Sequence, residues 1–160
     1  MRVRGIVFED FVNYKKPSMF LVTCACDWKC CSEAGISHDV CQNAPLMKSE
    51  IREFIDEAIY EAYIKNNISR AIVIGGLEPM LQADEVLNLV RTFRERGCND
   101  EIVIYTGYNK NEVLCTISEL KKFKNIIVKF GRYIPNCKTR YDDILGVTLA
   151  SENQYAEKIS

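Results

Sequence analysis

Five of the eight cysteines in the chain fall within one segment, between Cys24 and Cys41. Within this segment Cys26 and Cys30 form a C-x3-C pair, and Cys41 follows after ten intervening residues. Thiolates grouped on a loop hold zinc or iron–sulfur clusters, because several side chains must converge on one point. In a reducing compartment, such grouping indicates metal or redox chemistry rather than disulfides. The spacing therefore predicts a metal-binding loop.

Three thiolates, from Cys26, Cys30 and Cys41, would hold a [4Fe-4S] cluster and leave one iron open. Catalytic zinc sites keep a position open for substrate by the same logic. The open iron would chelate the amino and carboxylate groups of S-adenosylmethionine (SAM). An electron passed to the sulfonium would break a carbon–sulfur bond and form a 5′-deoxyadenosyl radical. We therefore expect two cofactors, a [4Fe-4S] cluster and SAM.

Zinc is the strongest alternative, because the segment offers more ligands than a tetrahedral zinc site requires. The additional candidates are Cys24, Cys31 and His38. We expect Cys24 to be a core residue, Cys31 to point away from the site that Cys30 faces, and His38 to be a plain loop residue. A thiol–disulfide exchange role is disfavoured, since the chain has no C-x2-C pair.

A second motif, Gly-Gly-Leu-Glu-Pro at residues 75–79, follows the apolar run 71–74. Glycines allow a backbone to approach a ligand closely, and a helix N-terminus presents free N–H groups to anions. The motif is also compatible with a plain turn from strand to helix, with Pro79 at the first helical position. The motif alone therefore does not establish a binding site; it supports one only together with the cysteines.

The apolar pattern predicts the elements that must position these motifs. Strands are expected at residues 19–22, 71–74, 102–105, 126–128 and 145–149, and helices from Ser49 to about 62, at 79–97 and at 113–120. Strands that alternate with helices imply parallel pairing with right-handed crossovers, and ligands bind beyond the carboxyl ends of such strands. We expect an α/β fold: an open partial (β/α) barrel of about five mostly parallel strands, with the helices on the outside.

Composition is consistent with a single domain over residues 1–160, since 48% of the residues are hydrophobic. A net charge of −1 gives no reason to expect a nucleic-acid partner. No apolar run approaches the roughly 20 residues that span a bilayer, so no membrane association is expected. The start, MRVRGIVFEDF, lacks the apolar core of a signal peptide, and we expect a cytoplasmic protein.

Taken in order, these motifs resemble those of the radical SAM superfamily, and most of all the activating proteins of anaerobic ribonucleoside-triphosphate reductase. The resemblance runs from about Phe20 to Gln154. Beyond C-x3-C and GG-x-EP it rests on residues 41–43 (CQN, like C-Y-N), 105–108 (YTGY, like W-T-G-Y), 128–133 (VKFGRY, like V-D-G-K-F) and 151–154 (SENQ, like S-x-N-Q).

The resemblance implies an enzyme that uses the cluster and SAM to place a glycyl radical on a larger partner, an anaerobic ribonucleotide reductase or a similar glycyl radical enzyme. A flavodoxin or ferredoxin would supply the electron. By position, Cys26, Cys30 and Cys41 would ligate the cluster. The residues implied around SAM are Trp28 near the adenine, Asn43 after the third cysteine, Gly75, Gly76 and Glu78 near the methionine amino group, Thr106 near the ribose or carboxylate, and Asn153 and Gln154 from the last segment.

The chain also departs from that family. Ten residues rather than two separate the second and third cysteines, Leu77 interrupts the GG-EP motif, and Lys129 stands where V-D-G has its aspartate. These changes fall on segments expected to meet the partner. Two alternatives therefore stay open: radical chemistry on a peptide or small molecule, and a zinc-stapled interaction module without enzymatic activity.

Overall fold

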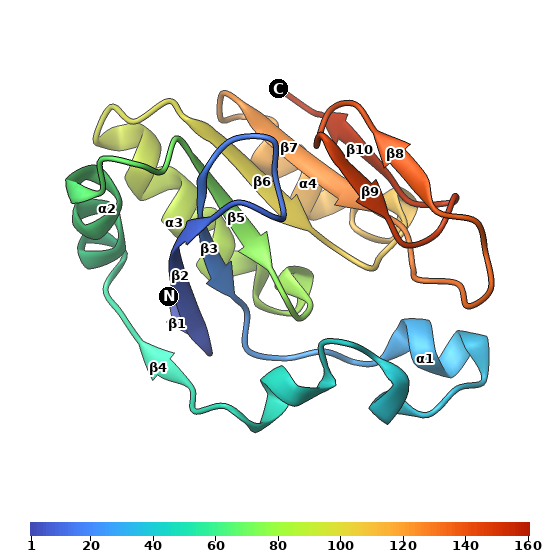
Figure 1. Cartoon of the computed structure of the whole chain (residues 1–160). Helices are drawn as coiled ribbons and strands as arrows, with labels where there is room; N and C mark the ends of the chain where they lie inside the picture. Colours follow the sequence, from blue (N-terminus) through green and yellow to red (C-terminus); the bar gives the residue numbers. More distant parts are fainter.

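A six-stranded mixed sheet forms the centre of the computed structural model, which describes residues 1–160 (Figure 1). The strand order is β10-β7-β6-β5-β3-β2. The strands are β2 (Gly5–Asp10), β3 (Ser18–Val22), β5 (Ala71–Gly75), β6 (Glu101–Tyr105), β7 (Ile126–Phe130) and β10 (Tyr155–Lys158). The four central strands β3, β5, β6 and β7 pair in parallel, whereas β2 and β10 pair antiparallel at the two edges.

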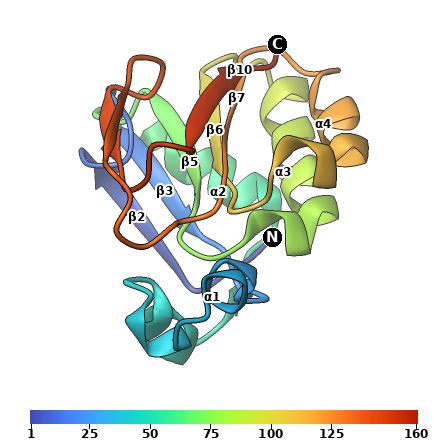
Figure 2. The ribbon, with the colours of Figure 1, turned by 90° about the vertical axis from the view of Figure 1, so that its right-hand side faces the viewer.

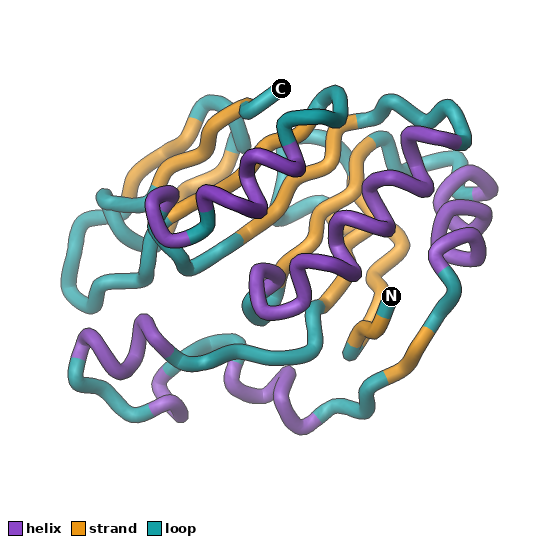
Figure 3. The backbone as a smooth tube through the Cα atoms, turned by 180° about the vertical axis from the view of Figure 1, so that it is seen from behind, coloured by secondary structure: helices purple, strands orange, loops and turns teal.

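Three helices cover one face of the sheet: α2 (Asp56–Lys65), α3 (Ala83–Glu95) and α4 (Leu114–Leu120) (Figure 3). The apolar stripe of α3 is buried against the strands, as its helical spacing predicts. Side chains of the three helices and the facing strand residues form the larger core, a cluster of 21 buried residues. The sheet is therefore stabilised mainly by apolar burial between these two layers.

The opposite face of the sheet is covered by a hairpin, β8 (Arg140–Asp142) with β9 (Val147–Leu149), and by the loop that carries Tyr14 (Figure 2). Alternate residues of the parallel strands, such as Val73 and Val103, point to this side and form a smaller core of eight residues. Because both faces are covered, the central strands read as continuous apolar runs.

Residues 23–51, which we call the cysteine segment, lie along the end of the sheet at which the parallel strands finish (Figures 1 and 2). The segment contains one short helix, α1 (Lys29–Ala34), and two 3-10 turns, η1 (His38–Val40) and η2 (Ala44–Lys48). Its exit is fixed by a two-stranded sheet that pairs β1 (Arg2–Val3) with β4 (Arg52–Glu53). No helix in the structure has both the length and the apolar character needed to cross a membrane.

The α/β class is confirmed, but the architecture differs from the expected partial barrel. The sheet is open and mixed, because its two outer strands run antiparallel to their neighbours. The expected strand at 145–149 lies in the separate β8–β9 hairpin, and the sequence analysis missed both edge strands. Edge strands are short and half exposed, so their apolar pattern is weak.

The helix expected from Ser49 is also different, because it begins only at Asp56. Residues 52 and 53 are extended instead, since they pair with the N-terminal strand β1. The N-terminal amino group then binds Asp56 Oδ1 at 2.8 Å, which secures the first turn of α2. A long-range pairing therefore overrides the helical spacing of the apolar residues.

The helix expected at 79–97 is confirmed in its main part. It opens with a 3-10 turn, η3 (Pro79–Gln82), and continues as α3. Gly97 adopts φ +85° just after the last turn, which is the left-handed conformation that ends many helices.

Candidate functional site

Backbone hydrogen bonds attach the start of the cysteine segment to the end of β5. Thr23 N donates to Gly75 O at 2.9 Å, and Glu78 N donates to Ala25 O at 2.8 Å. Cys26 follows at once, and Trp28 then turns the chain with φ +59° into α1, where Cys30 lies. These bonds place the C-x3-C pair beside the 75–79 loop, as the sequence predicts.

Four thiols of the segment lie next to one another in a chain. The Cys26 thiol is close enough to Cys30 for their charges to interact, and Cys31 lies near both Cys30 and Cys41. Cys26, Cys30 and Cys41 are partly exposed, whereas Cys31 is buried. Cys31 thus lies in the protein interior, between the partly exposed Cys30 and Cys41, and whether it points away from a cluster stays a prediction.

Cys24 and His38 stand outside this group. Cys24 is buried, and the charges that act on it come from Glu85, Arg2 and Arg4, on the other side of the segment. The His38 ring stacks on Trp28 with 5.0 Å between centroids and 12° between planes. Trp28, expected near an adenine, therefore packs against His38 within the segment.

The thiols fit an iron–sulfur cluster by donor type, although they do not form a closed cage. No set of three or more His, Cys, Asp or Glu side chains is arranged to hold a metal ion. Burial raises the pKa of Cys26 to about 12 and that of Cys31 to about 11. Metal ligation therefore requires proton release and a closer approach of the sulfurs, which is the usual coupling of metal binding to local folding.

One hydrogen bond already favours a metal ligand at Cys26. The Trp28 N–H donates to Cys26 Sγ at 3.4 Å and lowers the pKa of that thiol against the larger effect of burial. Backbone N–H groups aimed at cysteine sulfur are among the features that tune iron–sulfur clusters.

The two glycines of the 75–79 loop are required by packing within the protein. A Cβ on Gly75 would lie 2.9 Å from the Cβ of Tyr105, and one on Gly76 would lie 3.0 Å from a methyl group of Val22. Gly76 also has φ +82°, which favours glycine. The glycines thus let the loop pass tightly over β3 and β6, close to the cysteine segment.

Glu78 is buried at the centre of a hydrogen-bond group that joins two loops. Its carboxylate accepts from Thr106 Oγ1 at 2.6 Å, Gly107 N at 2.8 Å and Met80 N at 3.0 Å. Burial raises the pKa of Glu78, and these three bonds oppose that shift. Glu78 and Thr106, both sequence-predicted, are therefore together, and their polar atoms are bonded to each other.

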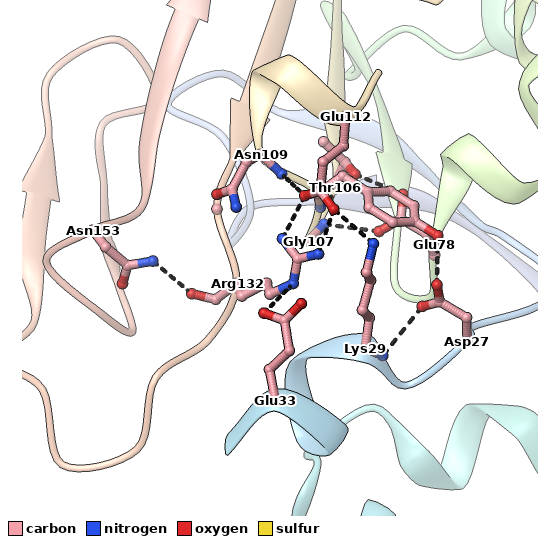
Figure 4. Close-up of polar contacts among 12 residues, drawn as sticks. Asp27, Lys29, Glu33, Glu78, Thr106, Gly107, Asn109, Glu112, Arg132 and Asn153 are labelled. Atoms are coloured by element: carbon pink, nitrogen blue, oxygen red, sulfur yellow. Dashed lines mark hydrogen bonds and ion pairs between the residues drawn. The ribbon is translucent and has the colours of Figure 1, made fainter. Parts of the chain in front are cut away.

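A charged cluster that the sequence analysis did not identify fastens α1 to the sheet (Figure 4). Arg132 forms two bonds to Glu112, at 2.5 and 2.7 Å, and Lys29 of α1 reaches the same carboxylate at 2.6 Å. Glu33, also on α1, lies 2.8 Å from Arg132 Nε as an ion pair without hydrogen-bond alignment. We call Lys29, Glu33, Glu112 and Arg132 the clamp.

The clamp is supported by a further contact from the C-x3-C loop. Tyr108 OH donates to Asp27 Oδ2 at 2.5 Å, and the Lys29 ammonium lies 5.0 Å from the centroid of the Tyr108 ring. Hydrogen bonds from Arg132, which have the largest effect, and from Lys29 hold the pKa of the Glu112 carboxyl well below its usual range. Both ends of the C-x3-C loop are therefore held at the ends of β6 and β7.

A cleft of about 390 Å³ opens beside the cysteines, within the size range of small-molecule sites. Cys30 and Glu33 line one side, and Asn109, Arg132 and Asn153 line the other. Asn153 donates to Arg132 O at 2.9 Å and lines the same cleft as Cys30. Asn43, in contrast, begins the η2 turn and lines neither this cleft nor the small pocket between Cys26 and Glu78.

A second group missed from the sequence is Lys129, a charged residue inside the otherwise apolar strand β7. Its side chain is buried, and burial lowers the pKa of its ammonium to about 8. A charge within a central apolar strand is the signal that would have identified it.

Comparison with known proteins gives one match. Searches of curated proteins and of solved structures found no similar protein. The sequence model of one family, described as the 4Fe-4S single cluster domain, matches residues 16–154, which include every cysteine of the segment, the clamp and Lys129. The chain therefore belongs to the 4Fe-4S single cluster domain family and is an iron–sulfur protein.

Proposed function

We propose that the chain is a radical SAM enzyme whose cluster is held by Cys26, Cys30 and Cys41. The observation that carries the proposal is the position of these thiols. Cys26 and Cys30 lie at the carboxyl ends of the parallel strands, beside the 75–79 loop, and Cys30 lines the cleft of about 390 Å³; Cys41 lies farther along the same segment, near Cys31. Ligands of parallel sheets bind at this end, and three thiolates leave one iron open to a substrate.

When bound, the cluster supplies one electron to the SAM sulfonium. The protein's own residues then have three tasks. The thiolates hold the metal, and the 75–79 loop and Thr106 form the adjoining wall of the site. The clamp keeps α1 attached beside the metal. Glu78, whose oxygens are taken by three donors, positions that wall. Trp28 and Asn153 border the C-x3-C loop and the cleft, where they would limit access of water.

The proposed reaction transfers one electron to SAM and one hydrogen atom from the partner to the adenosyl radical. A reduced flavodoxin or ferredoxin would supply the electron through the cluster, and SAM would separate into methionine and a 5′-deoxyadenosyl radical. That radical would take a hydrogen atom from a glycine Cα of a glycyl radical enzyme such as an anaerobic ribonucleotide reductase, giving 5′-deoxyadenosine and the glycyl radical. A large partner suits this chain, because a cleft open to solvent needs a second surface to exclude water.

The proposal is tested by anaerobic reconstitution with iron and sulfide, followed by dithionite reduction with SAM. We expect about four irons per chain and formation of methionine and 5′-deoxyadenosine in equal amounts. Cys30→Ala is the matched negative control, and Cys115→Ala, on the exposed surface of α4, is the matched positive control. A protein that holds the cluster but cleaves no SAM would contradict the radical SAM assignment.

The partner is tested separately, by anaerobic capture with the reconstituted protein as bait. Recovery of a glycyl radical enzyme, with a glycyl radical signal in electron paramagnetic resonance (EPR) after addition of SAM, is expected. SAM cleavage that yields a modified peptide or small molecule instead would replace this partner.

A further inference from the structure

Lys129 is a buried cation without an ion-pair partner. Its side chain is 7% exposed, at the end of the central strand β7. The ammonium donates to Gly131 O at 2.9 Å and forms no ion pair with any carboxylate. Transfer of an unpaired charge out of water is costly, so a negative charge placed nearby would stabilise the buried ammonium.

The side chain of Lys129 lies at the same end of the sheet as the cysteines. Lys129 is paired in register with Tyr105, the residue before Thr106. Successive residues of a strand alternate between faces, so Lys129 shares the face of Ile127, opposite the helices. Thr106, Glu78 and Lys129 therefore all lie where β5, β6 and β7 end, and Thr106 N donates to Lys129 O at 2.9 Å.

Two negative groups act on the Lys129 charge, Glu78 and Cys30. Glu78 forms no contact ion pair with Lys129, and its oxygens accept from Thr106, Met80 and Gly107. Cys30 is one of the proposed cluster ligands. The buried ammonium therefore lies between one buried carboxylate and the place proposed for the cluster, with room for further negative charge to stabilise it.

We propose that Lys129 is an electrostatic positioning residue for the iron–sulfur cluster, whose negative charge its buried ammonium balances and whose reduced state it favours. The inference rests on the proposed cluster at Cys26, Cys30 and Cys41. A cluster held by three thiolates gains one further negative charge on reduction, and a nearby cation in a medium of low dielectric constant stabilises that form more than the oxidised one. Second-layer groups of this type tune metal sites without touching the metal.

The test is a redox titration of the reconstituted protein, monitored by EPR of the reduced cluster. Lys129→Met removes the charge and keeps the length of the side chain, whereas Lys129→Arg keeps the charge. Lys16→Met is the matched control, because Lys16 pairs with Glu101 at the opposite end of β6. For Lys129→Met we expect the reduced-to-oxidised ratio at a fixed potential to fall about tenfold, a shift of ~59 mV for one electron. The Arg and Lys16 variants should keep the wild-type midpoint.

An unchanged midpoint in Lys129→Met, with iron retained, would overturn the inference and leave the cluster proposal standing. The same result with weaker binding of SAM would assign Lys129 to the SAM carboxylate instead.

If Lys129→Met loses iron while Lys129→Arg retains it, the charge is needed to hold the thiolates, which supports the proposal. Equal iron loss in both variants would show a packing role and overturn it. A wild-type chain that binds no iron would defeat both the inference and the proposed function.

Discussion

The sheet and the cysteine segment are stabilised in opposite ways. The central strands and α3 bury nearly all their apolar side chains in two clusters, of 21 and eight residues. In the cysteine segment only Thr23, Cys24 and Cys31 are buried, and its short helix and turns are held by hydrogen bonds and ion pairs at its borders. The sheet is therefore stabilised mainly by apolar burial, whereas the segment depends on its clamp and, we propose, on bound metal.

The largest expected effect separates iron binding from folding. Cys30→Ala should reduce the iron retained after reconstitution from about four per chain to nearly none, because it removes one of the proposed ligands. The urea midpoint of the metal-free protein should hardly change, since Cys30 lies outside the main core. Iron analysis and urea unfolding measure the two quantities.

The choice of third ligand is tested in the same assay. Cys41→Ala should lose the cluster and Cys31→Ala should retain it, although the two thiols lie near each other in the structure. The opposite outcome would make the buried Cys31 the ligand.

Ile104→Ala tests the other side of the comparison. Ile104 is fully buried in β6 between neighbouring strands and α3. Its truncation should lower the free energy of unfolding by about 2–5 kcal/mol, through lost transfer energy and a cavity. Iron per folded chain should stay at the wild-type value. A joint loss of iron and stability would show that sheet and segment form one cooperative unit.

Lys129→Met should stabilise the metal-free protein at pH 7, on the order of 3 kcal/mol, because the buried ammonium is a cost. The pKa of Lys129 is about 8 in the folded protein and about 10.4 in the unfolded chain. Burial of the ammonium therefore lowers the stability of the wild type by its full amount below pH 8, and this loss disappears as the pH rises from about 8 to about 10.4. The advantage of the variant should therefore shrink as pH rises from 8 to 10. Urea unfolding at several pH values checks the slope, and a constant advantage would contradict the burial argument.

The smallest expected effect concerns the clamp. Arg132→Gln should weaken the attachment of α1 by roughly 1–3 kcal/mol, because it leaves the part-buried Glu112 without its main partner. Amide hydrogen exchange in residues 29–34 should accelerate, while exchange in β5 and β6 stays slow. In the wild type the same acceleration should appear as the pH falls below about 4.3, where Glu112 begins to bind protons in the detached state. Arg91→Gln, on the exposed face of α3, is the control.

The sequence predicts the elements that are determined locally and misses those that depend on distant pairing. The runs at 71–74 and 102–105 are buried on both faces, so their apolar character is continuous and β5 and β6 were identified correctly. Ile51 and Ile55 have helical spacing after a candidate cap at Ser49, but pairing of residues 52–53 with the N-terminus keeps that stretch extended.

The candidate site shows the same division. The cysteines, Glu78 and Thr106 could be placed together because each follows a strand, and such ends meet at one edge of a parallel sheet. The ion pairs of Arg132 could not be predicted, since Glu33 lies on α1 and Glu112 ends the 3-10 turn Lys110–Glu112, with no shared spacing. Lys129 lay in a recognised motif, yet its burial is visible only once both faces of β7 are covered.

The most direct test of the account is Mössbauer spectroscopy of the protein reconstituted anaerobically with 57Fe, recorded with and without SAM. We expect the spectrum of one [4Fe-4S] cluster per chain, in which SAM changes the signal of a single iron, because three cysteines leave that iron without a protein ligand. A colourless chain that holds one zinc ion, or a cluster whose four irons are all unaffected by SAM, would contradict the account.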